Sequence, residues 1–313
     1  MTVDEQHAVD AASGGQPRMR VGVIGLGVMG RPMAANLMRA GFPVAVYARR
    51  AAATASLVAE GAVVCTSPAD LAARCDAVIT IVTADADVEQ VLFGPGGAAE
   101  GLAPGTLVID HSTISPSTAR ACASRLALQS VRMLDAPVSG GEAGAIAGTL
   151  SIMAGGDIEA FERARPLLEA VGRTLVHVGD SGAGQVAKAA NQLAICVTLQ
   201  GMAEAFCMAD AHGIDPRVLL ESLQGGATAS RMLDVMGPKM ASGDTRAGVE
   251  SRLHWKDLRI VLDAARRAGI ALPGAAIATQ TFSALQRAGG ERLDSSAILG
   301  IVRRDAADRL PPG

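Results

Sequence analysis

The chain has 313 residues, which is enough for about two domains with separate cores. Hydrophobic residues make up 49% of it and charged residues 19%, so most of the chain is expected to be globular. Aromatic residues account for only 2%, which argues against a groove that stacks nucleic-acid bases on aromatic rings. The formal net charge is −3 and no basic stripe stands out, so nucleic acid is not an expected partner.

The cysteines and the chain ends indicate where the protein works. The five cysteines are scattered and show no CxxC spacing, so we expect reduced thiols in a cytoplasmic protein and no metal site. Residues 1–18 lack a basic start followed by an apolar run, and we predict a disordered tail there instead of a signal peptide. A second tail is expected at residues 304–313. No stretch is expected to span a membrane.

The first half of the chain alternates short apolar runs with helix-like segments. Apolar runs of this length between turn residues are typical of buried parallel strands. We predict strands over residues 20–24, 44–47, 77–82, 106–110, 132–135, 150–154 and 174–178, and helices over 29–40, 52–60, 68–74, 86–92, 115–128 and 158–170. This alternation predicts an α/β fold with a doubly wound, Rossmann-type dinucleotide-binding domain over residues 19–182.

The strand signals end after Gly182. One long helix is predicted over residues 185–213, and shorter helices follow over 216–224, 229–236, 253–268, 273–288 and 295–303. Residues 183–303 are therefore expected to form an all-α substrate and oligomerisation domain. Such a helical domain often buries one face against a sister subunit, so we expect a homodimer or homotetramer.

A glycine-rich turn follows the first predicted strand and opens the first predicted helix, which is the context that a GxGxxG dinucleotide motif requires. The first glycine permits a tight turn, the second lets a pyrophosphate approach the backbone, and the third lets the helix pack on the sheet. The phosphates would face the helix N-terminus. We therefore predict cofactor contacts at Gly25, Leu26, Gly27, Val28, Met29 and Gly30. The alternative is a glycine-rich turn without a ligand.

The second predicted strand ends in Tyr47-Ala48-Arg49-Arg50, without an acidic residue. An acid at this position usually binds the ribose 2′-hydroxyl of NAD, whereas a nearby arginine accommodates the 2′-phosphate of NADP. Arg49 and Arg50 therefore favour NADPH over NADH. The alternative is a pair of solvated charges at a strand end.

Lys188, Asn191 and Gln192 have i, i+3, i+4 spacing, so they share one face of the long predicted helix. A lysine on such an apolar helix either extends its amine to water or is held for chemistry. A carboxamide one turn away can orient a substrate oxygen. The spacing alone leaves both interpretations open.

Four motifs, in this order, resemble those of the β-hydroxyacid dehydrogenase family, which includes 3-hydroxyisobutyrate dehydrogenases. They are Val23–Gly30 with the following Met33-Ala34 and Asn36-Leu37; Asp135-Ala136-Pro137-Val138-Ser139-Gly140-Gly141; Gly182–Gln192 around Lys188; and Lys256-Asp257-Leu258. The likeness covers about residues 20–302. Within the family the chain is most similar to the tartronate semialdehyde (2-hydroxy-3-oxopropionate) reductases, on Glu142, Asn191-Gln192, Gly225-Gly226 and Leu293–Ala297 among others.

The resemblance implies a role for each motif. Lys188 is the family's catalytic residue, with Asn191 beside it, and the substrate contacts are Ser139, Gly140, Gly141, Lys188, Asn191 and Gln192. Further cofactor contacts fall at Val82, Thr83, Thr113 and Lys256. The family usually has Leu-Pro or Val-Pro beside the nicotinamide, where this chain has Val82-Thr83. Structural alternatives are an ordinary turn at 139–141, a capping turn at Thr113 and a surface ion pair at Lys256.

The implied activity is NAD(P)H-dependent reduction of a short semialdehyde acid by hydride transfer, with a lysine general acid. The preferred substrate is 2-hydroxy-3-oxopropanoate, which gives glycerate, and no metal is expected. One alternative is a 3-hydroxyisobutyrate or related 3-hydroxyacid dehydrogenase. Two others share the fold: an imine reductase and a non-catalytic binding module, both of which usually lack the lysine.

Overall fold

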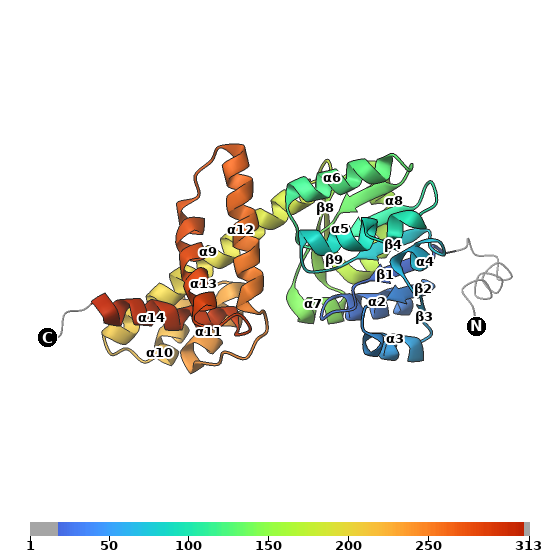
Figure 1. Cartoon of the computed structure of the whole chain (residues 1–313). Coiled ribbons are helices and arrows are strands. Elements are labelled where there is room, and N and C mark those ends of the chain that lie inside the picture. The colour runs from blue at the N-terminus through green and yellow to red at the C-terminus, as the bar shows by residue number, and fades with distance from the viewer. Residues whose placement is uncertain (1–17, 310–313) are drawn as a thin grey trace. The chain divides into compact units, whose positions relative to one another are not determined.

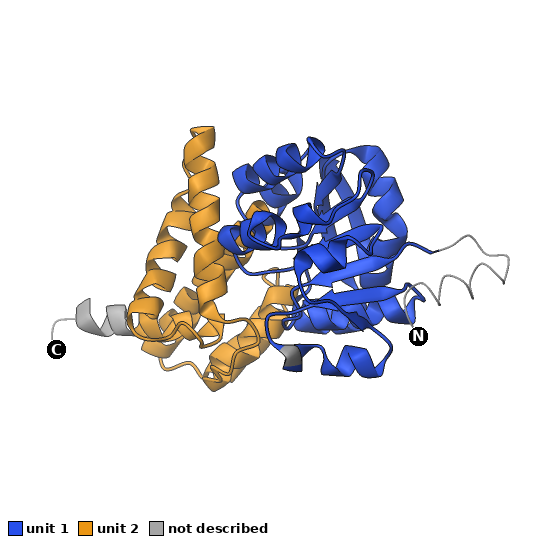
Figure 2. Ribbon diagram, turned by 45° about the vertical axis from the view of Figure 1, so that its right-hand side comes forward, with its two compact units in different colours: residues 1–188 blue, residues 189–313 orange. Residues whose placement is uncertain are grey.

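The computed structural model describes residues 18–309, apart from the side chains of Ala51 and of residues 304–309. Most of the predicted tails therefore lies outside the described residues. The chain divides into two compact units, residues 1–188 and residues 189–313 (Figure 2).

The first unit is built on one mixed sheet of nine strands, in the order β3-β2-β1-β4-β5-β6-β8-β7 with β9 beside β8 (Figure 1). Strands β1 to β6 run parallel to one another, whereas β8 is antiparallel to β6 and β7 and parallel to β9. The strands are β1 (Val21–Ile24), β2 (Val44–Tyr47), β3 (Val63–Val64), β4 (Ala77–Thr80), β5 (Leu107–Asp110), β6 (Arg132–Asp135), β7 (Val138–Ser139), β8 (Leu150–Gly155) and β9 (Gly172–Gly179). The predicted α/β, Rossmann-type architecture is confirmed.

Helices cover both faces of this sheet, because the central strands are apolar on both sides. One core cluster joins α2, α7 and α8 to side chains such as Val23 and Ile79, and the other joins α4, α5 and α6 to Ile24 and Val78. The helices are α2 (Gly30–Arg39), α3 (Ala55–Ala59), α4 (Pro68–Ala72), α5 (Asp85–Phe93), α6 (Pro116–Ala127), α7 (Gly141–Ala147) and α8 (Ile158–Val171), with short 3₁₀ turns η1 (Ala51–Ala53) and η2 (Ala98–Glu100).

Two strands and one α-helix of this unit were not predicted from the sequence, and neither was the η2 turn. Strands β3 and β7 have two residues each, which is too short for a periodic signal. Helix α7 contains glycine at its first and fourth positions, and glycine is a poor helix former. The predicted helix over residues 52–60 is also wrong in its length, since the structure has the η1 turn followed by the five-residue α3.

The second unit is all-helical, as predicted, and packs around one apolar core that includes Phe206 and Phe282. Its helices are the C-terminal part of α9 (Ala183–Ala211), then α10 (Pro216–Gln224), α11 (Arg231–Ser242), α12 (Ser251–Ala268), α13 (Pro273–Arg287) and α14 (Ile298–Arg309), with the turn η3 (Ser295–Ala297). Helix α11 runs past its predicted end at Met236 and includes Pro238. Helix α14 also takes in the first residues of the predicted tail at 304–313.

Helix α9 begins in the first unit and continues into the second. It is long and apolar enough to cross a membrane by length and composition, a property that core helices of soluble proteins share. One such helix is weak evidence for a membrane span, so it does not overturn the expectation from the sequence that no stretch spans a membrane. Four of its polar residues are buried: Gln185, Lys188, Gln192 and Gln200.

Candidate functional site

The loop between β1 and α2 has the geometry that the glycine motif predicts. Gly25 has a positive φ of 101°, and a Cβ there would collide with the carbonyl oxygen of Ile81. A Cβ on Gly30 would collide with the carbonyl oxygen of Gly25, so the helix can start here only without a side chain. By contrast, no atom lies within 4 Å of the Cβ position of Gly27. Since Met29 gives α2 no side-chain cap, the N-terminal amides of the helix suit a phosphate, and the loop fits a dinucleotide.

The ends of β2, β4 and β5 present the other predicted cofactor contacts of this unit at the same sheet edge. Arg49 and Arg50 follow β2 and are exposed. The backbone N–H of Val82, after β4, donates to Oγ of Ser112, after β5, at 2.9 Å. The structure therefore brings the Val82–Thr83 segment next to the segment that contains Thr113.

The predicted substrate loop joins β7 to α7. Gly140 and Gly141 have φ values of 141° and 63°, so both adopt backbone conformations that L side chains rarely take. Gly140 is exposed, and the Cβ position of Gly141 is open. Consecutive amides in such a turn can converge on an anion, as a substrate carboxylate requires. Helix α7 is fixed from behind by Asn36 of α2, whose Nδ2 donates to the carbonyl oxygen of Ala145 at 2.7 Å.

Asp135, at the end of β6, anchors the start of α9. Its Oδ1 accepts the backbone N–H of Gly182 at 2.7 Å, and its Oδ2 accepts that of Gln185 at 2.9 Å. A Cβ on Gly184 would collide with the carbonyl oxygen of Asp135, so the helix can approach β6 this closely only with glycine there. Lys188 lies one turn further along and is 7% exposed. Burial raises the pKa of Asp135, while the two N–H donors oppose that shift.

Gln185 ties the same turn of α9 to the segment after β5. Its Oε1 accepts the backbone N–H of Ile114 at 3.1 Å, and its Nε2 donates to the carbonyl oxygen of Ser112 at 2.8 Å. These are the two neighbours of Thr113. Sequence analysis gave Gln185 no role, although its position three residues before Lys188 could have indicated one.

In the second unit, the predicted site residues Asn191, Gln192 and Lys256 are joined through polar contacts that meet at Asp257. Nδ2 of Asn191 donates to Oε1 of Gln192 at 2.8 Å, and Nε2 of Gln192 donates to Oδ2 of Asp257 at 2.5 Å. Nζ of Lys256 lies 3.0 Å from Oδ1 of Asp257. Lys256 therefore forms an ion pair with its neighbour Asp257, which is the structural alternative stated for this lysine. Both side chains are largely buried, so the pair does not lie on the surface. Asp257 was part of a motif in the sequence but had no assigned role, and it proves to be the common partner of Gln192 and Lys256.

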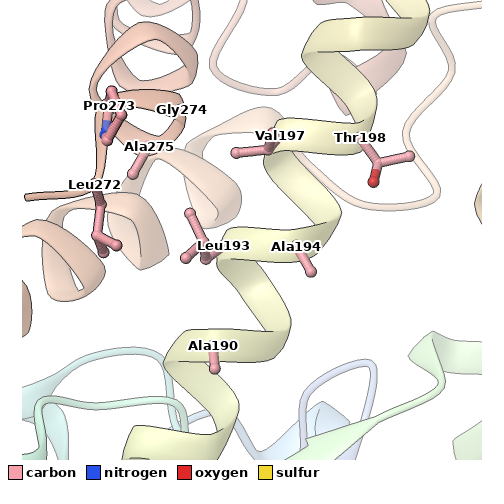
Figure 3. Close-up of a pocket in the computed structure, with 9 residues that line it drawn as sticks. All are labelled: Ala190, Leu193, Ala194, Val197, Thr198, Leu272, Pro273, Gly274 and Ala275. Atoms are coloured by element: carbon pink, nitrogen blue, oxygen red, sulfur yellow. The ribbon is translucent and has the colours of Figure 1, made fainter.

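A cavity of about 440 Å³ in the second unit contains none of these residues. It is lined by small and apolar side chains of α9 and of the start of α13, such as Leu193, Val197 and Leu272 (Figure 3). A lining of this kind offers no charged group to a carboxylate. Within residues 18–309, no three His, Cys, Asp or Glu side chains are grouped as a metal ion would require.

Two family models match the chain. The model of the NAD-binding domain of 6-phosphogluconate dehydrogenase matches residues 20–179, and the model of the NAD-binding domain of NADP-dependent 3-hydroxyisobutyrate dehydrogenase matches residues 182–302. Together they cover most of the chain.

Curated relatives and solved structures agree with these models. The 2-hydroxy-3-oxopropionate reductase of Escherichia coli is 38% identical over 93% of this chain and 100% of its own length. The NAD-dependent L-serine dehydrogenase of Pseudomonas aeruginosa is 39% identical over 89% of this chain and 96% of its own. The crystal structure of 3-hydroxyisobutyrate dehydrogenase from Salmonella typhimurium superposes with a TM-score of 0.83 at 35% identity, covering 90% of this chain and 99% of that one.

Asp110 generates a prediction about stability. Its Oδ1 accepts from Oγ1 of Thr80 and from the backbone N–H of Ser112, whereas its fully buried Oδ2 has no hydrogen-bond partner. Burial raises the pKa of Asp110 to about 6. A raised folded-state pKa means that the folded protein keeps its proton where the unfolded chain loses it, so this residue's contribution to stability is lost as pH rises from about 4 to about 6.

Asp110→Asn removes that titration and keeps an oxygen for both donors. The free energy of unfolding of the variant minus that of the wild type should therefore grow by on the order of 2–3 kcal/mol between pH 4 and pH 6, and then level off. Urea unfolding at a series of pH values measures this difference. A difference that stays constant across the series would contradict the prediction.

Proposed function

The chain belongs to the β-hydroxyacid dehydrogenase family and is an NAD(P)-dependent oxidoreductase, and from this premise we propose that it reduces a short semialdehyde acid. The preferred substrate is 2-hydroxy-3-oxopropanoate, and the product is glycerate. One observation carries the proposal: the segment 135–141 both anchors the first turn of α9 and ends in the Gly140-Gly141 turn. The buried amine of Lys188 and the proposed carboxylate site are therefore set by one short piece of chain.

Each group has a chemical task in this proposal. The amides and hydroxyl of Ser139, Gly140 and Gly141 bind the substrate carboxylate. NADPH, when bound at the Gly25–Gly30 loop, supplies the hydride to the aldehyde carbon. Lys188 donates a proton to the carbonyl oxygen as general acid, and in the oxidative direction it accepts the proton from the hydroxyl. Asn191, supported by Gln192, orients that oxygen.

The choice of substrate draws on the relatives. One relative is named for 2-hydroxy-3-oxopropionate and others for L-serine and 3-hydroxyisobutyrate. The reduced forms of these acids share a carboxylate and a hydroxyl group on the β-carbon. They differ in the substituent on the α-carbon. 3-Hydroxyisobutyrate is therefore the runner-up for this chain.

A substrate panel tests the choice. The kcat/KM values are measured with NADPH and NADH for 2-hydroxy-3-oxopropanoate, methylmalonate semialdehyde and a cyclic imine, and for glycerate, 3-hydroxyisobutyrate and L-serine in the oxidative direction. We expect the highest value for 2-hydroxy-3-oxopropanoate. A higher value for methylmalonate semialdehyde would favour the runner-up, and turnover of the imine alone would refute the proposal.

We also infer a homodimer or homotetramer in the cytoplasm, acting on a small anionic substrate. The support for an oligomer is the exposure of large apolar side chains in the second unit, which include Val197, Met208 and Ile277. The support for a reducing compartment is that all five cysteines are free. Light scattering coupled to size-exclusion chromatography measures the oligomeric state.

The role of Lys188 gives the first prediction about the activity. Lys188→Ala should lower kcat by about 10²–10⁴-fold, the usual size of general acid–base catalysis. The dissociation constant for NADPH should stay close to that of the wild type, since the phosphates are expected at the loop before α2. Steady-state kinetics and fluorescence titration measure the two effects, and a variant with near-normal turnover would remove the mechanism.

The proposed carboxylate site at Gly140 gives the second prediction about the activity. Gly140→Val should raise the KM for the acid steeply, because a branched side chain would fill the site and the φ of 141° disfavours it. Gly105→Val is the matched control, since Gly105 has a positive φ of 85° and open space around its Cβ position but precedes β5 at the opposite edge of the sheet. Equal kinetic effects of the two changes would show that the acid binds elsewhere.

The choice between NADPH and NADH gives the third prediction about the activity. NADPH should be preferred over NADH, because a guanidinium can bind the 2′-phosphate by charge-assisted hydrogen bonds that are worth about 10- to 100-fold in affinity. Arg49→Ala should narrow the preference mainly through the KM for NADPH, whereas Arg173→Ala, at an exposed arginine of β9, should not. Ala48→Asp combined with Arg49→Ala should shift the preference towards NADH. A wild-type enzyme with a higher kcat/KM for NADH would refute this assignment.

A further inference from the structure

Gln185 joins two segments that are far apart in the sequence. Its side chain is 1% exposed and uses both ends of its carboxamide on backbone groups of the segment after β5. The oxygen accepts the N–H of Ile114 and the nitrogen donates to the carbonyl oxygen of Ser112. A two-point contact of this kind fixes both the distance between the segments and their relative rotation.

The proposed chemistry requires these two segments, residues 112–114 and the start of α9, to be held in a fixed position relative to each other. Ser112 and Ile114 flank Thr113, which is expected to face the nicotinamide ribose. Gln185 and Lys188 are three residues apart on α9, so their side chains leave the same face of the helix. The carboxamide therefore links the turn that holds the amine to the loop that is expected to hold the reacting end of the cofactor.

The segment is supported from a second side as well. The N–H of Val82 donates to Oγ of Ser112, and Ser112 in turn donates its own N–H to Asp110. Because Gln185 binds the carbonyl of the same Ser112, the ends of β4 and β5 and the start of α9 form one hydrogen-bonded assembly. A shift of α9 relative to the sheet edge would break both contacts of Gln185.

We propose that Gln185 is a positioning residue that sets the position of Lys188 relative to the bound nicotinamide, an inference that rests on the proposed function. It does not touch the reacting atoms. Small displacements of a proton donor from a hydride acceptor slow the chemical step without weakening cofactor binding. A residue that only satisfied buried backbone groups would affect stability alone.

Gln185→Met tests the proposal, because methionine keeps the length of the side chain and removes both polar atoms. Gln200→Met is the matched control: Gln200 is also a buried glutamine of α9, and its Nε2 donates to Glu204 one turn further along the same helix. Full-length variants are compared with the wild type for kcat, for the primary deuterium isotope effect with NADPH deuterated at the transferred position of C4, for the dissociation constant of NADPH and for the melting temperature. Assays are run well below the melting temperature.

We expect Gln185→Met to lower kcat by about 10-fold or more and to raise the isotope effect, while the dissociation constant of NADPH changes by less than about 3-fold. Gln200→Met should leave kcat and the isotope effect near the wild-type values. If Gln185→Met lowers only the melting temperature, its role is structural and the inference is wrong. Wild-type protein that turns over none of the acids would overturn the proposed function and this inference together.

Gln185→Glu provides a second variant that keeps the size of the side chain. Its carboxylate can still accept from Ile114, but while ionised it cannot donate to the carbonyl oxygen of Ser112. The charged groups on the segments around it are Asp135, which accepts the N–H of residue 185, Asp110, which accepts the N–H of Ser112, and Lys188, three residues further along α9. Protonation of the introduced carboxylate restores a hydrogen-bond donor for the carbonyl oxygen of Ser112. We therefore expect kcat relative to the wild type to recover as pH falls, and a pH profile parallel to that of the wild type would contradict the positioning role.

Discussion

The site depends on one buried carboxylate that binds the start of a helix. Asp135 takes two backbone N–H groups at the first turn of α9, donors that a helix otherwise leaves unsatisfied. Taking this carboxylate out of water is costly, and the two hydrogen bonds together with the positive end of the helix dipole offset that cost. The contact also restricts the sequence, because Gly184 packs on the backbone of Asp135 and leaves no room for a side chain. Lys188 is buried one turn later as a consequence of where α9 is made to start.

Carboxylates also fix which way the amides of the site point. An ionised carboxylate only accepts hydrogen bonds, so Gln192 must turn its nitrogen towards Asp257 and its oxygen towards Asn191. Asn191 must then give its nitrogen to Gln192, which leaves its oxygen for another donor. Asp110 is a different case: burial raises its pKa, and its Oδ2 has no hydrogen-bond partner. The orientation of the Gln192 and Asn191 amides is therefore set by the hydrogen bond to Oδ2 of Asp257.

The sequence predicted the long and strongly patterned elements, including β1, β5, α6 and α10, because their apolar runs and capping residues are local signals. It missed β3, β7 and α7, which depend on neighbouring strands and on glycines whose conformation no local pattern reports. The site follows the same division. The glycine loop and the spacing of Lys188, Asn191 and Gln192 are local and were predicted, whereas Gln185 and Asp257 act on partners that are 71 and 65 residues away. Contacts over such separations follow from how distant strands and helices pack against one another, which composition and periodicity do not specify.

The groups proposed to act on the substrate are common to the family and do not by themselves select one acid. The groups proposed to bind the carboxylate are the backbone amides of Ser139, Gly140 and Gly141 and the hydroxyl of Ser139, and the group proposed to move the proton is one amine. Any acid with a hydroxyl one carbon beyond the α-carbon satisfies both. Discrimination among such acids has to come from side chains that touch the substituent on the α-carbon, and a difference of one methyl or hydroxyl group there is worth only about 1–3 kcal/mol unless a polar partner is left unpaired. Two relatives that are 38% and 39% identical to this chain are named for different acids, which agrees with that view.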